Sequence, residues 1–591
     1  MPRFPLLLAF TLIVTTLFAS DLQVKVVDPQ GAVVAAARVS AYPAGSNTPG
    51  ATAETRADGV AQLAGLAEGT FQIRVLAPGF APAEATLTFP AKETAVVHLA
   101  LASAATTVVV SAERTPLPLD ESTADTSQLD ARDLTAMQPV AASDAIRFLP
   151  GAIVAVSGQR GGLASLFVRG GDSRYNKVII DGVPVNDPGG TFDFSVIPMD
   201  QVERMEFVRG AESTLYGSDA MTSVVQFWSR TGSTRMPELR FGADGGTFGT
   251  AHGYASLAGA RGRFDYNLFG DQFTTGGQGA NDDYSNSSQG ANVGVVLAPR
   301  VTFRLRARHA NERTGVPSFW SFNGQPLLPP DTDQRARQNN FLASAELTFT
   351  STRWQHRFTG FEYHHRRLNV DTVQEAGRVS PSYGNIDYPF SDYLNVNRAG
   401  FDYQGEYDER SWARTTVGYN FEDENGFVGD LTYPPLGHGL RLNQAAYVEQ
   451  IIAMGRLSLV GGVRFVHNTT FGNKAVPRAA ASFAVLKGGK VFSGTRLRFS
   501  YATGIKEPRL EEAFGIGGFN IIPNPNLQAE QNRAFEAGVQ QSMFAGKGFV
   551  SATYFNNLFT NQIAFSSDPV TYVAQYVNLN RALAHGAEVE I

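Results

Sequence analysis

The sequence predicts a mainly β protein with an N-terminal β-sandwich, a small α/β domain and a large antiparallel transmembrane β-barrel. The 591 residues include 41 Phe, 19 Tyr and 59 Gly, and only 18% are charged, which suits many strands joined by turns. The second half alternates apolar and polar residues, as in Arg496-Leu497-Arg498-Phe499-Ser500-Tyr501. A strand between lipid and a wet lumen requires this alternation, although a soluble all-β protein could also show it.

Composition excludes several classes of function. The net charge of -6 and the pI near 5.9 argue against a nucleic-acid partner. The chain has no cysteine, and it lacks the Gly-x-Ser-x-Gly elbow, the His-Glu-x-x-His zinc motif and the phosphate-binding loop. We therefore expect no enzymatic activity, with no catalytic residue, metal ligand or cofactor.

Residues 1–20 have the pattern of a secretory signal peptide. Arg3 precedes an apolar run from Phe4 to Phe18, and the small residues Ala19 and Ser20 follow. The run is too short for a membrane-spanning helix, and no later segment supplies one. A membrane form of this chain must therefore cross with strands.

Residues 21–103 predict a small β-sandwich of short alternating strands. The expected strands include 22–26, 33–41 and 70–75, with a turn at Asp58-Gly59. The segment resembles the carboxypeptidase regulatory-like domain, on the set Thr55, Asp58, Gly59, Leu66, Gly69, Phe71, Val75, Ala77, Gly79 and Phe80. Any small immunoglobulin-like sandwich is the alternative.

Residues 104–116 hold an isolated β-branched run. The β-branched residues are Val108, Val109 and Val110. Ser111 and Ala112 complete the segment, and Pro116 follows it. Such a segment can add to the edge of another protein's sheet through backbone hydrogen bonds. The alternative is the last strand of the preceding sandwich.

Residues 117–232 should form a compact α/β domain with helices at 130–137 and 142–149. Its collinear motifs are Phe-Val-Arg-Gly-Gly at 167–171, Val-Ile-Ile-Asp-Gly-Val-Pro-Val-Asn at 178–186, Val-Glu-Arg-Met-Glu-Phe-Val-Arg-Gly at 202–210 and Leu-Tyr-Gly-Ser-Asp-Ala at 215–220. They resemble the plug domain of TonB-dependent outer-membrane receptors. The motif residues carried over are Gly170, Asp181, Gly182, Glu203, Arg204, Gly210, Tyr216 and Gly217.

The resemblance implies where the protein lies and what it contacts. It implies a cell outer membrane location with the N-terminal domain in the periplasm, and it makes the segment of residues 108–112 a TonB box. The implied partners are TonB with its inner-membrane energising complex, outer-membrane lipid, and a small-molecule or chelate ligand. The implied function is active import of a scarce, bulky solute, first of all an iron–siderophore complex. Cobalamin or an oligosaccharide is the next choice, and a surface adhesion or sensing protein without transport is the contrasting class.

One segment departs from the family pattern. Where two glycines are usual, this chain has Ala-Met-Thr-Ser-Val-Val-Gln-Phe at 220–227. Losing both glycines removes backbone freedom, so the plug should pack or move somewhat differently there.

Residues 233–591 should form the barrel. We place about 16 alternating segments there, whereas plugged receptors have about 22 strands. We therefore interpret the chain as a fragment that lacks about six closing strands. A smaller natural barrel is the alternative. The expected extracellular loops are 276–289, 312–338, 372–392, 425–440 and 505–532. The second holds the candidate ligand residues Phe319, Trp320 and Phe322, for which packing within the loop is the alternative.

Strand parity predicts an ion cluster between plug and barrel. Arg169 and Arg209 each end a Phe-Val-Arg-Gly motif, and the resemblance places both on the plug surface. Alternation around Phe535 to Gln540 and Ala587 to Ile591 turns Glu536 and Glu588 inward, because a carboxylate facing lipid would be costly. We expect these four residues to meet, the alternative being four separately solvated charges. By the same parity, His364 and His365 should point to opposite faces as a surface feature.

Overall fold

The computed structural model describes residues 21–28, 31–77, 80–90, 94–100, 109–110, 114, 117–118, 122–317, 329–375, 377–380, 384–385, 387–515, 521–544, 547–579 and 581–591. The expected signal peptide lies outside these residues. The fold is mainly β, as predicted. Within the described part of the chain, none of the helices has the length and apolarity that a membrane crossing demands.

The N-terminal domain is a sandwich of two sheets, with strand orders β4-β1-β7 and β3-β2-β5-β6. Alternating side chains such as Val24 and Ile73 are fully buried between the sheets. The second strand begins at Arg38, five residues later than expected, because Ala36 has a positive φ of 55° and turns the chain. The strands are β1 (Leu22–Val27), β2 (Arg38–Pro43), β3 (Ala51–Glu54), β4 (Val60–Leu63), β5 (Gly69–Leu76), β6 (Ala83–Phe89) and β7 (Ala95–His98).

A two-stranded ribbon connects the sandwich to the α/β domain. It pairs β8 (Val109–Val110) with β9 (Leu117–Pro118), and it belongs to neither sheet of the sandwich. Of the predicted TonB contact residues, Val108, Ser111 and Ala112 lie outside the described residues.

The α/β domain, which we call the plug, has a five-stranded mixed sheet in the order β10-β15-β16-β13-β14. Asp130 caps the first helix through its side chain, and the second helix ends at Ile146, three residues before the expected end. The elements are β10 (Asp125–Asp130), α1 (Ala131–Met137), α2 (Ala142–Ile146), β11 (Ala152–Val156), β12 (Ala164–Val168), η1 (Ser173–Tyr175), β13 (Asn176–Ile180), β14 (Val183–Pro184), β15 (Val202–Arg209), α3 (Ser213–Tyr216) and β16 (Ser223–Ser229).

The segment that departs from the family pattern, residues 220–227, leads into β16, the central strand of the plug sheet. Met221 in this segment is fully buried, and a methyl group on Gly504 of the barrel would lie 2.8 Å from the Met221 Cα. The plug backbone can therefore approach the barrel wall closely here because the wall has a glycine, Gly504, although the plug segment lacks its usual glycines.

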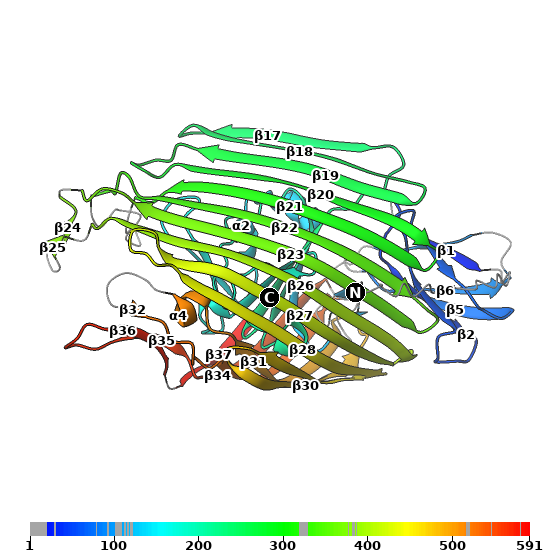
Figure 1. The fold of residues 1–591 in the computed structure, drawn as a ribbon. Helices are drawn as coiled ribbons and strands as arrows, with labels where there is room; N and C mark the ends of the chain where they lie inside the picture. Colours follow the sequence, from blue (N-terminus) through cyan, green and yellow to red (C-terminus); the bar gives the residue numbers. More distant parts are fainter. Residues whose placement is uncertain are drawn as a thin grey trace, which may run out of the picture.

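The barrel is one 16-stranded antiparallel sheet that surrounds the plug, with β17 and β37 as its edge strands (Figure 1). Its strands are β17 (Glu238–Gly246), β18 (Thr250–Arg261), β19 (Phe264–Thr275), β20 (Tyr284–Ala298), β21 (Val301–Gly315), β22 (Arg335–Thr350), β23 (Trp354–Asp371), β26 (Phe390–Arg410), β27 (Ala413–Asp430), β28 (Gly437–Met454), β29 (Leu457–Asn468), β30 (Gly472–Lys487), β31 (Phe492–Lys506), β33 (Glu530–Met543), β34 (Gly548–Thr560) and β37 (Ala582–Glu590). This matches the expected 16 segments.

The two ends of the barrel differ. The sandwich lies at the end where short turns join the strands (Figure 1, right). The opposite end carries the longer connections and the remaining elements β24 (Val379–Ser380), β25 (Gly384–Asn385), α4 (Leu510–Phe514), β32 (Ile521–Ile522), β35 (Ile563–Ser567) and β36 (Ala574–Asn578).

The long connections are shorter than the sequence suggested. Strands extend into the expected loops at 276–289 and 425–440, since β20 begins at Tyr284 and β27 continues to Asp430. Polar residues continue the hydrogen-bonded ladder there, so a polar composition did not mark the end of a strand.

The outer face of the barrel is apolar. Large exposed side chains alternate along its strands, among them Phe241, Leu268, Phe465, Phe499 and Phe535. Exposed apolar residues in such numbers would aggregate in water, and they are the surface that a bilayer covers.

Candidate functional site at the plug–barrel interface

Arg169 of the plug forms the centre of an ion cluster against the barrel wall. Its guanidinium group lies 2.8 Å from a carboxylate oxygen of each of Glu536 in β33, Glu588 in β37 and Asp125 in the plug. The Arg169 side chain is only 1% exposed, and it follows β12 in a left-handed conformation with φ of 49°. Directional bonds from one guanidinium to three carboxylates fix the orientation of the plug, and they also compensate the buried positive charge of Arg169.

Asp125 joins the two predicted arginines. It pairs directly across the sheet with Arg209, and its other oxygen accepts from Arg169. Arg498 in β31 lies 3.2 Å from the same carboxylate. Although burial acts to raise the pKa of Asp125, the guanidinium groups of Arg498, Arg209 and Arg169 hold that pKa well below its usual range.

The predicted cluster thus contains Arg169, Glu536 and Glu588, but the expected partners of Arg209 need correction. Among the described residues, Arg209 has ion pairs with Asp125 at 2.8 Å and with Glu590 at 3.6 Å. Glu590 has the same strand parity as Glu588, and Asp125 lies opposite Arg209 in the sheet register. Sequence reasoning missed Asp125 because its pairing with β15 spans more than seventy residues of chain.

Several plug motif glycines lie where the backbone approaches the wall. Gly210 has φ of +106°, and a methyl group there would overlap the Glu536 carboxylate. Gly170 has φ of +73° and would place a methyl group 2.5 Å from Ala584 Cβ. Gly217 has φ of +77° and faces Arg464, whereas Gly182, with φ of +87°, has open space around it. Conformation and close contact with the barrel together require glycine at 170 and 210.

The other motif residues stabilise the plug itself. Asp181 accepts hydrogen bonds from the Ser229 backbone and hydroxyl at 2.8 and 2.6 Å. Tyr216 accepts from Gln226 at 3.0 Å, and the Arg204 guanidinium lies 3.8 Å from the centre of the Trp228 ring. Glu203 is exposed at the start of β15.

The segment after β8 is anchored inside the barrel by Arg114. The Arg114 guanidinium donates to the Tyr447 hydroxyl at 2.8 Å and to both oxygens of Asp402 at 3.2 Å. Gln404 donates to the Arg114 carbonyl at 3.0 Å. The predicted TonB contact segment therefore immediately precedes a residue bound to barrel strands β26 and β28.

The sandwich docks on the short-turn end of the barrel through a buried arginine. Arg38, 1% exposed, contacts Glu406 and lies 2.5 Å from Asp408, both in β26. Asp408 also pairs with Arg414 at 2.7 Å. The sandwich is thus joined to the barrel by charged groups that neutralise one another.

A cavity of about 1250 Å³ lies at the opposite end, between the plug and strands β21, β22, β23 and β26. Asp187 of the plug faces it, 3.1 Å from both the His365 ring and the Arg367 guanidinium of β23. Phe192, Tyr363 and Phe390 contribute apolar surface. The cavity thus combines aromatic walls with more carboxylates than guanidinium groups. The carboxylates are those of Asp187, Asp193, Asp371, Asp387 and Asp392, and the guanidinium groups are those of Arg367 and Arg378.

The two adjacent histidines point to opposite faces, as expected. His364 is exposed and bonds Asn395, whereas His365 is 4% exposed and faces the cavity. Classing His365 as a surface feature was therefore wrong, because strand parity turns one of two neighbours inward. The candidate ligand residues Phe319, Trp320 and Phe322 lie outside the described residues.

Known families match three parts of the chain. Residues 263–591 match the family described as TonB dependent receptor-like, beta-barrel. Residues 118–224 match the TonB-dependent Receptor Plug Domain, and residues 21–102 match the Carboxypeptidase regulatory-like domain.

Solved structures share the fold at low identity. The siderophore receptor PirA from Pseudomonas aeruginosa is 18% identical, with a TM-score of 0.60 over 78% of this chain and 81% of that one. The ferric enterobactin receptor PfeA, in complex with BCV-L6, is 17% identical, with a TM-score of 0.62 over 78% of each chain. PirA from Acinetobacter baumannii is 15% identical, with a TM-score of 0.62 over 78% of this chain and 77% of that one. These neighbours are receptors and not enzymes, and the barrel match alone covers more than half of the chain. The protein belongs to the TonB-dependent receptor family of the outer membrane.

Proposed function

We propose that this receptor imports a scarce, bulky solute, with an iron–siderophore complex as the first candidate. The observation that carries the proposal is the cavity of about 1250 Å³, which the plug closes on one side. Its volume exceeds the roughly 300–1,000 Å³ of ordinary small-molecule pockets. Aromatic surface from Phe192, Tyr363 and Phe390 suits an aromatic chelate. Two of the structures with this fold are described as siderophore receptors and a third as a ferric enterobactin receptor.

The energy for import would come through the segment at Val108 to Ala112. TonB would pair with it as an added strand and pull. Arg114 follows within two residues of Ala112, so a pull would be transmitted first to its bonds with Asp402 and Tyr447. Release of these bonds would precede rearrangement of the plug.

The orientation follows from the two ends of the barrel. Outer-membrane barrels have short periplasmic turns and longer extracellular loops. The N-terminal sandwich docks at the short-turn end, which would place it in the periplasm, and the cavity would open to the outside. In this proposed arrangement the ligand and TonB would lie on opposite sides of the plug.

Import of cobalamin or an oligosaccharide is the alternative within transport, and adhesion or sensing is the contrasting class. The cavity between plug and barrel favours an enclosed ligand over an adhesive surface. The test is growth of an iron-starved strain on single ferric chelates, with and without the gene, and with and without TonB. The proposal expects gene-dependent and TonB-dependent growth on at least one chelate. Growth that is independent of the gene on every chelate would overturn the choice of iron, and cobalamin and oligosaccharides would then be supplied in the same way.

A further inference from the structure

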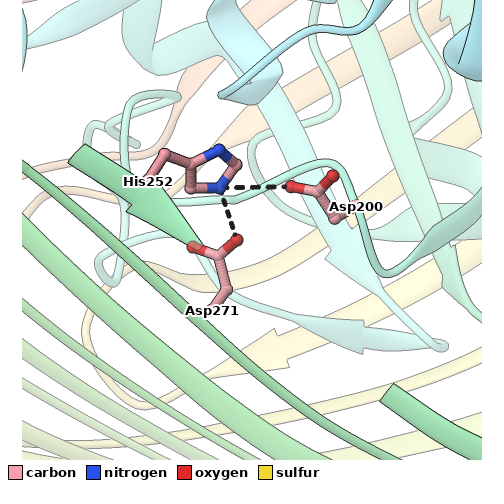
Figure 2. Close-up of side chains that lie close together, drawn as sticks. All are labelled: Asp200, His252 and Asp271. Atoms are coloured by element: carbon pink, nitrogen blue, oxygen red, sulfur yellow. Dashed lines mark hydrogen bonds and ion pairs between the residues drawn. The ribbon is translucent and has the colours of Figure 1, made fainter. Parts of the chain in front are cut away.

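A histidine of the barrel wall faces a carboxylate of the plug and a second carboxylate of the wall. His252 lies in β18 and Asp271 in the neighbouring β19, while Asp200 lies in the plug loop before β15. Figure 2 shows all three side chains converging, with the same ring nitrogen directed at both carboxylates. His252 and Asp271 are 7% and 6% exposed.

The distances suit a shared cation. His252 Nε2 lies 2.9 Å from Asp271 Oδ2 and 3.5 Å from Asp200 Oδ2, and the three donor atoms lie within 4.8 Å of one another. Tetrahedral zinc with bonds of about 2.0–2.2 Å separates its ligands by roughly 3.4 Å. The observed separations from Nε2 lie on either side of that value.

The other nitrogen of the ring is held in the manner of a metal-binding histidine. Nδ1 lies 2.9 Å from Asp244 Oδ2, and Asp244 is the direct partner of His252 in the β17–β18 register. Metal-ligating histidines commonly donate this proton to a carboxylate, which directs the lone pair of Nε2 at the metal. The Asp200 Oδ2 atom is buried and accepts no hydrogen bond among the described residues, and its contact with His252 is the ion pair at 3.5 Å.

We propose that Asp200, His252 and Asp271 bind a divalent transition-metal ion of the zinc type, which fastens the plug to the first strands of the barrel. The ion replaces the proton on Nε2, which is released to solvent, and water completes the coordination. Two negative charges and one neutral imidazole then neutralise the ion. The inference does not depend on which solute the receptor imports.

Without a metal, the same residues form only ion pairs around a protonated His252. Asp244 and Asp271 would each accept a hydrogen bond from the imidazolium. The positive charge of the Arg308 guanidinium also stabilises the Asp271 carboxylate. Stoichiometric metal binding distinguishes the metal site from the metal-free ion pairs, because the ion pairs need no metal.

The test measures Zn²⁺ bound by the full chain in detergent, after removal of metal with a chelator and dialysis against Zn²⁺. We expect one Zn²⁺ per chain, and loss of that ion in His252→Ala and Asp271→Asn. The control is His438→Ala, which removes an exposed histidine that hydrogen-bonds Asn425 and stacks on Phe427, and this variant should keep the ion. Asp244→Asn preserves the three ligands and should weaken binding by about 10- to 100-fold.

A second readout tests the fastening. Zn²⁺ should slow hydrogen exchange of the plug loop at residues 198–204 in the wild type, and Asp200→Asn should abolish that effect. Visible absorption of Co²⁺ in place of Zn²⁺ should show four-coordinate bands that His252→Ala removes. Absence of Zn²⁺ binding by the folded wild type, or equal binding by folded His252→Ala, would overturn the proposal. If His252→Ala fails to fold, Asp244→Asn decides by the same measurement.

Discussion

Arg169 Nη1 lies 2.8 Å from Glu536 Oε1, and this contact joins the centre of the plug to β33 of the barrel. The same guanidinium also reaches Glu588 in β37. Directional charge pairs with β33 and β37 of the barrel therefore help to position the plug, in addition to the complementary shapes of plug and barrel.

Removing Arg169 should loosen the plug. Arg169→Ala leaves Asp125, Glu536 and Glu588 without their shared guanidinium, at a cost of roughly 3–5 kcal/mol for a buried pair. Hydrogen exchange of β12 should report the lower free energy of local opening. The control is Arg160→Ala, whose pair with Asp144 is 40% exposed on the arginine side and should contribute about 0–1 kcal/mol. Equal effects of the two changes would contradict a central role for Arg169.

Acid should weaken the same interface. The pKa of Asp125 is depressed in the folded protein, so its stabilising contribution is complete above the unfolded pKa of about 3.9. The contribution is lost as the pH falls below that value toward the folded pKa. Protection of β10 and β15 amides should be constant from pH 7 to about 5 and decline below about 4. In Asp125→Asn the β10 and β15 amides should be less protected at pH 7, and the decline in acid should be smaller. An unchanged decline would show that Asp125 is not the group responsible.

Two plug glycines allow a matched test of contact with the wall. Gly182 and Gly210 both have positive φ, at +87° and +106°, but only Gly210 faces Glu536. Gly182→Ala should cost roughly 1–2 kcal/mol from backbone strain alone. Gly210→Ala should cost more, since the methyl group also displaces Glu536 from Arg169. Thermal unfolding of the two variants measures the difference, and a smaller effect at 210 would contradict the contact.

Arg114 should hold the TonB contact segment inside the barrel. Arg114→Ala removes the bonds to Asp402 and Tyr447, so a protease should cleave the segment at residues 104–116 faster than in the wild type. Arg56→Ala is the control, because its pair with Asp58 is partly exposed at 3.9 Å. Unchanged cleavage of the Arg114 variant would show that other contacts hold the segment.

The sequence predicted features that depend on local pattern. Alternation placed Glu536 and Glu588 on the inner face, and motif order placed Arg169 beside them. The chemistry of capping also located α1, since Asp130 starts it. In each case the information lies in a local pattern or in the order of motifs along the chain.

Features that depend on distant pairing could not be predicted in this way. Asp125 is a polar residue in an unremarkable strand until its register with Arg209 is known. Nothing local to Arg38 in the sandwich indicates that docking on β26 buries it against Glu406 and Asp408. His252 belongs to no motif, and only the packing of the plug brings Asp200 to it.

Uptake by a variant of the TonB contact segment tests the proposed import most directly. Val109→Pro removes a backbone donor from the segment, whereas the control Val109→Ala keeps it. Cells that express each form would be given the radiolabelled ferric chelate that supports growth in the screen above. We predict that Val109→Pro binds the chelate as the wild type does, yet accumulates it no faster than cells without TonB, while Val109→Ala imports it. Uptake by Val109→Pro at the wild-type rate would contradict the account.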